Sequence, residues 1–172
     1  LVFLALFLLM KSIPLLDIKV LKFFNTLMID KTSFSFFSEI GDGLICLAIT
    51  VPILSLISYR TPLNNVEVQT LVFVGLGVGL IVKALKELTS LYAVRPGFYE
   101  FEDVIYLEPV YLYSSFPSGH AATIFSLFLV RISLAFRNTK ISNAGLTITL
   151  LLILALMVSL SRVIVAAHWL SD

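Results

Sequence analysis

Residues 141–161 read ISNAGLTITLLLILALMVSLS, a run without a charged side chain. Two further uncharged runs cover residues 43–59 and 68–82. A helix needs roughly 20 apolar residues to cross a bilayer core of about 30 Å, so runs of this kind are typical of membrane-spanning helices. The sequence therefore predicts an all-α protein, a polytopic helical bundle in a membrane.

The overall composition supports the same class of protein. Hydrophobic residues make up 59% of the 172 residues, and charged residues make up 13%, about half the fraction of an ordinary soluble domain. The net charge of +1 gives no reason to expect a nucleic-acid partner. The single cysteine, Cys46, cannot form an internal disulfide.

Five hydrophobic segments follow one another along the chain. We expect residues 1–10 to be the trimmed end of a first span, and we place the other spans at residues 43–59, 68–88, 117–136 and 144–167. The chain stops soon after the fifth span, which suggests a cut at that end too. With no sign of a second domain, we expect a single membrane-embedded domain over residues 1–172.

Two shorter stretches need a separate interpretation. Residues 15–28, LLDIKVLKFFNTLM, have the pattern of an interfacial amphipathic helix, with an apolar face that includes Leu15, Ile18, Leu21 and Leu27. The stretch GLGVGL at residues 75–80 lies inside a predicted span, whereas a dinucleotide-binding loop needs a preceding strand. We interpret its glycines as packing residues that let helices approach closely.

The loop charges predict how the chain is oriented in the membrane. The loop after the fourth span is purely basic, whereas the loop after the third span is rich in acids. The basic residues are Arg131, in the last turns of the fourth span, with Arg137 and Lys140 in the loop, and the acidic loop contains Glu100, Glu102, Asp103 and Glu108. The positive-inside rule places the basic loop in the cytoplasm and the acidic loop outside.

Polar residues gather at three places that this topology brings to the outer face. Consecutive spans alternate in direction, so the end of the third span, the start of the fourth and the end of the fifth meet on one side. These places hold Lys83, Lys86 and Arg95, then Ser118, Gly119 and His120, then Ser161, Arg162 and His168. Ionisable residues at membrane depth mark functional sites by default. The cluster of cations predicts a site for an anion.

The residue types suit the transfer of a phosphoryl group. Arginine can form bidentate hydrogen bonds to two phosphate oxygens, and lysine adds a point charge. Pro117 suits the first turn of a helix, whose amides at Ser118, Gly119 and His120 would point at an anion. A histidine can act as nucleophile or as proton donor, so two histidines could do both. We see no metal-ligand spacing and expect neither a metal nor another cofactor.

Two blocks of sequence resemble a known family. FPSGH at residues 116–120 and SRVIVAAHWLSD at residues 161–172 are similar to the second and third signature blocks of the type 2 phosphatidic-acid phosphatase superfamily, which comprises membrane lipid-phosphate phosphatases. The third block, S-R-x(5)-H-x(3)-D, is matched at every specified position. The first, K-x(6)-R-P, is matched only at Arg95-Pro96, because Leu88 stands at the lysine position. We favour Lys86 over Lys83 as the replacement.

The resemblance implies an architecture and a mechanism. The family has six spans, so the sixth would be absent from this chain, and its active site faces the periplasm or the cell exterior. It hydrolyses a membrane lipid phosphate or diphosphate without a metal, through a phosphohistidine. His168 would be the nucleophile, Asp172 would orient it, and His120 would protonate the leaving oxygen. The phosphate would be held by Lys86, Arg95, Ser118, Gly119 and Arg162.

Two other functions remain open from the sequence. A lipid phosphotransferase would use the same intermediate and pass the phosphate to another lipid. A non-catalytic relative would bind lipid phosphates without turnover, an alternative that the missing lysine at Leu88 keeps open. The sequence names neither the lipid nor the oligomeric state. We expect Trp169 to be an anchor at the membrane interface.

Overall fold

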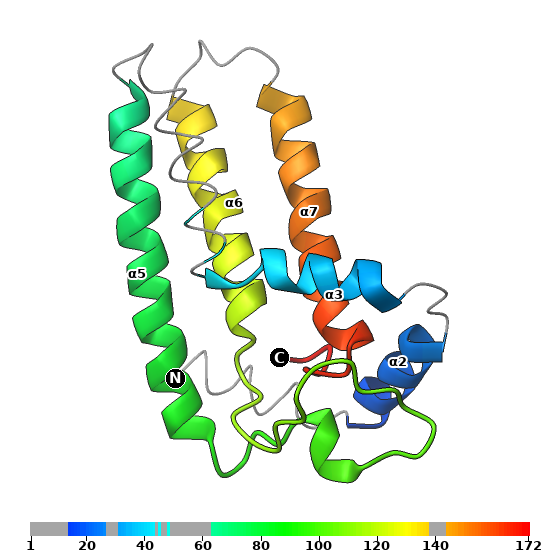
Figure 1. Ribbon diagram of the computed structural model, residues 1–172. Helices are drawn as coiled ribbons and strands as arrows, with labels where there is room; N and C mark the ends of the chain where they lie inside the picture. The colour runs from blue at the N-terminus through cyan, green and yellow to red at the C-terminus, as the bar shows by residue number, and fades with distance from the viewer. Residues whose placement is uncertain (1–13, 27–30, 44, 46–47, 49–62, 138–143) are drawn as a thin grey trace. The chain divides into compact units, whose positions relative to one another are not determined.

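The computed structural model describes residues 14–26, 31–43, 45, 48, 63–137 and 144–172. All regular elements in these ranges are helical, and no strand is assigned there, which confirms the predicted all-α class (Figure 1). The elements are α2 (Pro14–Thr26), α3 (Lys31–Ile40), α5 (Leu63–Thr89), the 3₁₀ helix η1 (Pro96–Tyr99), α6 (Gly119–Arg137) and α7 (Ala144–Ile164).

The described chain divides into two compact units. Unit 1 contains the described parts of Leu1–Phe36, Leu85–Ser118 and Leu160–Asp172, and unit 2 contains those of Phe37–Ala84 and Gly119–Ser159. Helices α5 and α7 each contribute to both units. Unit 1 holds most of the loops, and unit 2 holds most of the long helices.

In unit 2, three long helices share one hydrophobic core. Leu71 of α5 packs with α6 and α7, and Ile40 at the end of α3 packs against the same cluster. The buried members are Leu71, Ile124, Leu127, Val130, Ala155 and Val158. These positions recur at helical spacing along α6 and α7, so each helix buries one stripe and leaves the rest of its apolar surface outside.

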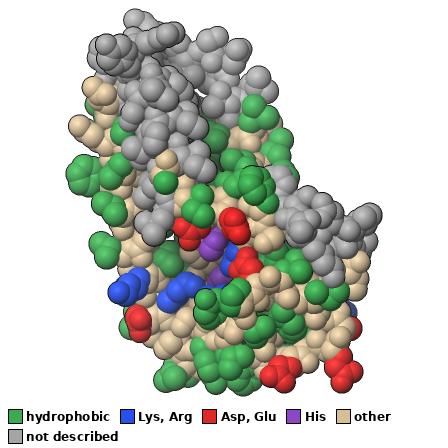
Figure 2. All heavy atoms as spheres, viewed as in Figure 1, with side chains coloured by type: hydrophobic (Ala, Val, Ile, Leu, Met, Phe, Trp, Pro, Cys, Tyr) green, Lys and Arg blue, Asp and Glu red, His purple; other side chains and the backbone are tan. Residues whose placement is uncertain are grey.

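The apolar surface outside these cores supports association with a membrane. Residues Val68–Thr89 of α5 are long and apolar enough to cross a bilayer, whereas the apolar stretches Gly119–Val130 and Ile148–Ile164 are shorter, in a search of the described residues. Large side chains on α5 point outward, with Phe73 75% and Leu80 71% exposed. Hydrophobic side chains are spread over the visible surface (Figure 2). Such exposure is unusual for a protein surrounded by water.

The predicted spans are confirmed as helices only in part. The third, fourth and fifth spans correspond to α5, α6 and α7. Residues 1–10 and most of residues 43–59 lie outside the described residues, as do Cys46, Lys140 and the side chains of Arg131 and Arg137. The six-span architecture therefore stays a prediction.

Helix α2 turns only part of the predicted face inward, because Leu21 lies in the core and Ile18 packs against it while Leu15 does not. Leu15 is 71% exposed, whereas Asp17 and Asn25 are buried together with Leu21. Leu27 lies outside the described residues. The two polar side chains are buried because they bind backbone elsewhere in unit 1. Asn25 donates to the carbonyls of Ile105 and Ile164 at 2.9 Å, and it accepts from the amide of Ile105 at 2.9 Å.

Two further expectations are not met in the described residues. Within that part of the chain, nothing beyond the helix's own backbone lies within 4 Å of a Cβ placed on Gly77 or Gly79, so no close helix packing against these two glycines is found there. Trp169 is 6% exposed and belongs to the core of unit 1, with Leu21, Val104, Val163 and Ala166. Its indole Nε1 donates to the carbonyl of Val94 at 2.7 Å, so this residue is a core side chain and no interfacial anchor.

Candidate active site

The chain turns back on itself directly after α7. The helix ends at Ile164, and Ala166 adopts a left-handed conformation with φ of 59°. The amides of Ala167 and His168 then both donate to the carbonyl of Arg162, at 3.0 and 3.1 Å. These bonds satisfy an open carbonyl of the last turn. They fix His168 in a turn and not on a continuing helix.

His168 and Asp172 form a buried pair within this turn. Nδ1 of His168 lies 3.2 Å from Oδ2 of Asp172, and the two side chains are 3% and 0% exposed. The family resemblance implied this pairing, and a helix would place residues four apart on one face. The contact exists, but the helix does not, because residues 165–172 form turns.

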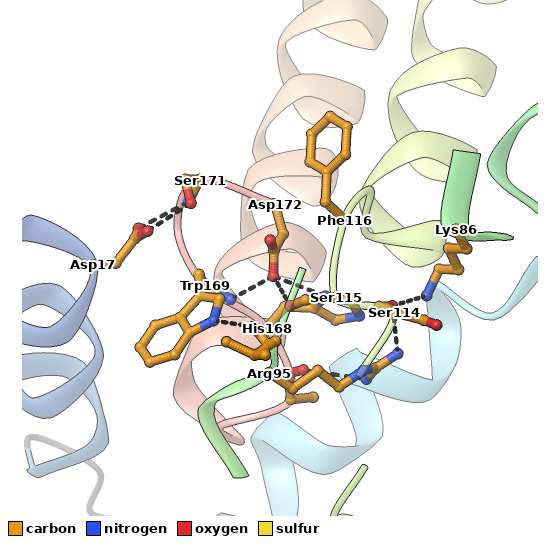
Figure 3. A network of polar contacts seen from close by, with 12 residues as sticks. Asp17, Lys86, Arg95, Ser114, Ser115, Phe116, His168, Trp169, Ser171 and Asp172 are labelled. Atoms are coloured by element: carbon orange, nitrogen blue, oxygen red, sulfur yellow. Dashed lines mark hydrogen bonds and ion pairs between the residues drawn. The ribbon is translucent and has the colours of Figure 1, made fainter. Parts of the chain in front are cut away.

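The carboxylate of Asp172 is fixed by further donors (Figure 3). Its Oδ2 accepts from the amide of Trp169 at 2.9 Å and from the hydroxyl of Ser115. A carboxylate held in this way can orient a histidine without moving itself. With Nδ1 donating to Asp172, the lone pair of the neutral His168 ring lies on Nε2.

Burial sets the charge of the imidazole. It lowers the pKa of His168 from 6.5 to about 4, although the hydrogen bond and the negative charge of Asp172 act in the opposite direction. The neighbouring cations Arg95 and Lys86 lower this pKa further. The ring is therefore neutral at pH 7, and a neutral imidazole is the form that can act as a nucleophile.

Backbone carbonyls hold two cations beside this pair. Arg95 donates through Nε to Tyr113 at 3.0 Å, through one terminal nitrogen to Ala167 at 3.2 Å and through the other to Ser114 at 3.4 Å. Lys86 Nζ donates to the same carbonyl of Ser114 at 3.1 Å (Figure 3). Ser114 has φ of 56°, a conformation uncommon for a residue with a side chain.

The electrostatics of Arg95 indicate a site that is short of negative charge. Burial and then the nearby charge of Arg162 lower the pKa of Arg95 below its ordinary value, whereas Asp172 and Glu108 raise it. An arginine stays protonated in proteins. Arg95 is half-buried, and a partly desolvated guanidinium that is repelled by another cation gains most from an anionic ligand.

Arg162 and Ser118 complete the cluster in unit 1. Arg162 is 5% exposed and pairs with Oε1 of Glu108 at 2.6 Å. Ser118 is 4% exposed, and its amide donates to the main-chain oxygen of Asp172 at 3.0 Å. The expectation that this amide points at an anion is therefore wrong. Pro117 also lies before α6, which begins at Gly119, and not in its first turn.

Comparison with known proteins decides the family. The model of the PAP2 superfamily matches residues 67–172, which is more than half of the chain. The chain belongs to the PAP2 superfamily. The solved structures include a similar one, the crystal structure of LpxE from Aquifex aeolicus, with a TM-score of 0.70 and 21% sequence identity. The match covers 91% of this chain and 85% of that chain, and it shows a shared fold. A search of curated proteins gives no match.

Membership of the PAP2 superfamily confirms the resemblance that the sequence suggested. It supports phosphatase activity on a lipid phosphate and, with the apolar α5, association with a membrane. The signature residues divide between the two units. Unit 1 brings together Lys86, Arg95, Ser118, Arg162, His168 and Asp172, whereas Gly119 and His120 belong to unit 2.

The two remaining signature residues of the PAP2 superfamily form the start of α6. Gly119 and His120 follow Ser118 directly in the chain. In unit 2, a Cβ on Gly41 would lie 3.0 Å from the Cβ of His120 and 3.2 Å from its Cδ2, and it would also meet Val158. The close approach of Gly41 therefore fixes the place of the His120 side chain, a contact that the sequence did not reveal.

The lysine of the PAP2 first block is absent, because Leu88 stands at its position, and the sequence suggested Lys86 in its place. Leu88 is 76% exposed on α5. Lys83 is also exposed and belongs to unit 2, while Lys86 reaches the carbonyl that binds Arg95. The geometry of unit 1 thus supports Lys86 as the lysine of the site.

Sequence reasoning missed several partners of the site. Ser115 was the one with a visible signal, because it lies two residues before the PSGH stretch and carries a hydroxyl. Glu108 was noted only as a loop charge, although it pairs with Arg162. The carbonyls of Tyr113, Ser114 and Ala167 left no signal, since every residue has one.

Proposed function

We propose that this protein hydrolyses a membrane lipid phosphate or diphosphate through a phosphohistidine on His168, without a metal. The observation that carries the proposal is the buried, neutral imidazole of His168, oriented by Asp172 beside the cations Lys86 and Arg95. This arrangement supplies a nucleophile and a receptor for phosphate in one place.

The first step forms the covalent intermediate. The lone pair on Nε2 of His168 attacks phosphorus, and the bond between phosphorus and the lipid oxygen breaks. A protonated His120 gives its proton to that oxygen, so the lipid leaves as a neutral alcohol, or as a monophosphate when the substrate is a diphosphate. The phosphorylated ring of His168 carries positive charge, which the carboxylate of Asp172 stabilises.

The second step returns the enzyme to its starting state. The now neutral His120 takes a proton from a water molecule while the water oxygen attacks phosphorus. The nitrogen–phosphorus bond breaks, and inorganic phosphate leaves. In both steps Lys86, Arg95 and Arg162 stabilise charge on the phosphoryl oxygens, with Ser118 and Gly119 completing the pocket.

We also propose that the site faces the periplasm or the cell exterior in a multi-pass membrane protein. The support is the contrast between the acidic loop after α5 and the basic residues in the last turns of α6 and just after it. A membrane-impermeant phosphatase inhibitor added outside intact cells should stop turnover. Inhibition only after the cells are opened would contradict this orientation.

Activity of the purified full-length protein tests the reaction. Lipid phosphates and diphosphates in detergent, with EDTA present, should release inorganic phosphate, and His168→Ala should abolish the release. Turnover that survives in His168→Ala would refute the mechanism. Rapid quenching with labelled substrate should trap an acid-labile, alkali-stable phosphate on the protein, as expected of a phosphohistidine.

Matched lysine variants test the identity of the basic residue. Lys86→Met should raise KM and lower kcat, whereas Lys83→Met should resemble the unmodified protein. The reverse ranking would assign the role to Lys83. In the same assays, transfer of labelled phosphate to a second lipid would identify a phosphotransferase, and binding without turnover would identify a non-catalytic protein.

A further inference from the structure

A second hollow in unit 1 borders the catalytic turn. It has a volume of about 270 Å³, and its lining includes Asp17 and Ile18 of α2, Tyr92, Tyr99 and Trp169. None of these side chains has a role in the reaction proposed above. Sites for small molecules usually enclose about 300–1,000 Å³, so this hollow suits a small chemical group and not a large ligand.

A buried carboxylate gives the hollow a negative charge. Asp17 is 6% exposed. It accepts from the amide of Ser171 at 3.0 Å and from the hydroxyl of Ser171 at 2.6 Å (Figure 3). Both donors are neutral, and within the described residues no basic side chain pairs with Asp17. Each carboxylate oxygen can accept a second hydrogen bond, so Asp17 retains the capacity to bind a cation.

Two of the aromatic rings of the hollow, those of Tyr99 and Trp169, are held by neighbouring groups before any ligand arrives. Tyr99 stacks on Phe101, with ring centroids 5.6 Å apart and planes 13° from parallel. It also meets Trp169 edge-on, at 5.9 Å and 73°. The hydrogen bond from Trp169 to Val94 holds the indole in turn. Such rigid aromatic surfaces bind without first losing side-chain entropy.

We propose that this hollow is a binding site for an organic ammonium group. Aromatic faces attract cations, most strongly quaternary ammonium groups, and a buried carboxylate adds a full opposite charge. The same carboxylate disfavours phosphate. The hollow is thus complementary in charge to the anion site of Lys86 and Arg95.

The two sites share one short segment of chain. Trp169 lines the hollow with its ring while its amide donates to Asp172. Ser171 binds Asp17 and precedes Asp172 directly. An ammonium group bound at Asp17 therefore lies against the segment that carries the catalytic pair. It can come from a soluble amine or from the headgroup of a lipid.

The single tryptophan of the chain makes the proposal measurable. We would titrate the full-length protein in a non-ionic detergent with choline and ethanolamine, and follow both Trp169 fluorescence and the heat of binding. The neutral control is 3,3-dimethylbutan-1-ol, which has the shape of choline without its charge. We expect saturable binding of the two cations and none of the alcohol.

Three variants separate the contributions. Asp17→Asn keeps an acceptor for Ser171 but removes the charge, and Tyr99→Leu removes a ring without touching Asp17. Each should weaken choline binding about tenfold or more, the scale of losing one desolvated cation contact. Glu102→Gln removes an exposed acid of unit 1 and should leave binding unchanged. No binding of either cation, equal binding of the alcohol, or unchanged affinity in both Asp17→Asn and Tyr99→Leu would overturn the proposal.

Nanodiscs distinguish the two sources of the group. If discs containing phosphatidylcholine compete with choline and discs of phosphatidylglycerol do not, the ligand is a lipid headgroup. If neither competes while free choline binds, it is a soluble amine. Choline binding should persist in His168→Ala, so the test stands apart from the proposed phosphatase reaction.

Discussion

Acidification tests whether burial keeps His168 neutral. Burial lowers the pKa of this residue from 6.5 to about 4, against the opposing effect of Asp172. The difference corresponds to roughly 3 kcal/mol of free energy that disfavours the protonated ring. We expect the imidazole to stay neutral well below pH 6.5, where an exposed histidine is already charged.

The same difference predicts how stability depends on pH. The unfolded chain takes up this proton at a higher pH than the folded protein, so protonation favours unfolding. The stabilising effect of the neutral ring is fully present above pH 6.5, and it is lost as the pH falls from 6.5 to about 4. The complete loss amounts to roughly 3 kcal/mol.

The presence of two histidines in the chain makes a direct assay possible. In a His120→Gln variant, His168 is the single imidazole, and ¹⁵N NMR of the protein in detergent micelles would follow its titration. We expect a midpoint near 4. The melting temperature of this variant should also fall more on acidification than that of a His120→Gln/His168→Gln double variant. A midpoint at or above 6.5, or equal losses in the two variants, would refute the reasoning.

Three further substitutions test contacts of the site. Ser115→Ala removes a donor to Asp172. Since a hydrogen bond to a charged group contributes about 1.5–3 kcal/mol, kcat should fall roughly 10- to 100-fold with little change in KM. The control Ser133→Ala, at an exposed position, should be neutral, and Ser115→Thr should restore part of the activity. Gly41→Ala forces a methyl group against His120 and Val158 and should cost about 1–3 kcal/mol of stability, seen as a lower melting temperature. The control Gly77→Ala has open space and should be neutral or slightly stabilising. Asn25→Leu leaves backbone groups of Ile105 and Ile164 without their partner and should destabilise the folded protein by about 1–3 kcal/mol or more. Thr26→Val, at an exposed position, is the control. An unchanged melting temperature of Asn25→Leu would contradict the role of α2 in holding these loops.

Side-chain chemistry made part of the fold and of the site predictable. Long uncharged runs located α5 and α7, because few other structures accommodate so many apolar residues. Residue type and topology also selected Arg95 and His168, and the family resemblance added Asp172. Where the prediction failed, the deciding partner was distant in the chain. The burial of Asp17 on α2 could not be inferred from the apolar residues of that helix, because Asp17 binds Ser171, 154 residues away.

Local backbone conformation set a second limit. The spacing of His168 and Asp172 suggested a helical face, but the left-handed turn at Ala166 ends the helix before either residue. Alanine is a poor marker for such a turn, since glycine is the residue that adopts it at little cost. The sequence could therefore identify the pair but not the geometry that joins it.

The partners of the cations show why this cluster can still attract an anion. Lys86 and Arg95 are held by the carbonyls of Tyr113, Ser114 and Ala167, which orient the side chains but carry no net charge. A carboxylate in the same place would neutralise them and compete with phosphate. Arg162 is the contrast, because its ion pair with Glu108 already offsets its charge. In the proposed reaction we therefore expect Lys86 and Arg95 to supply most of the attraction for the phosphoryl group, and Arg162 to act mainly by its position.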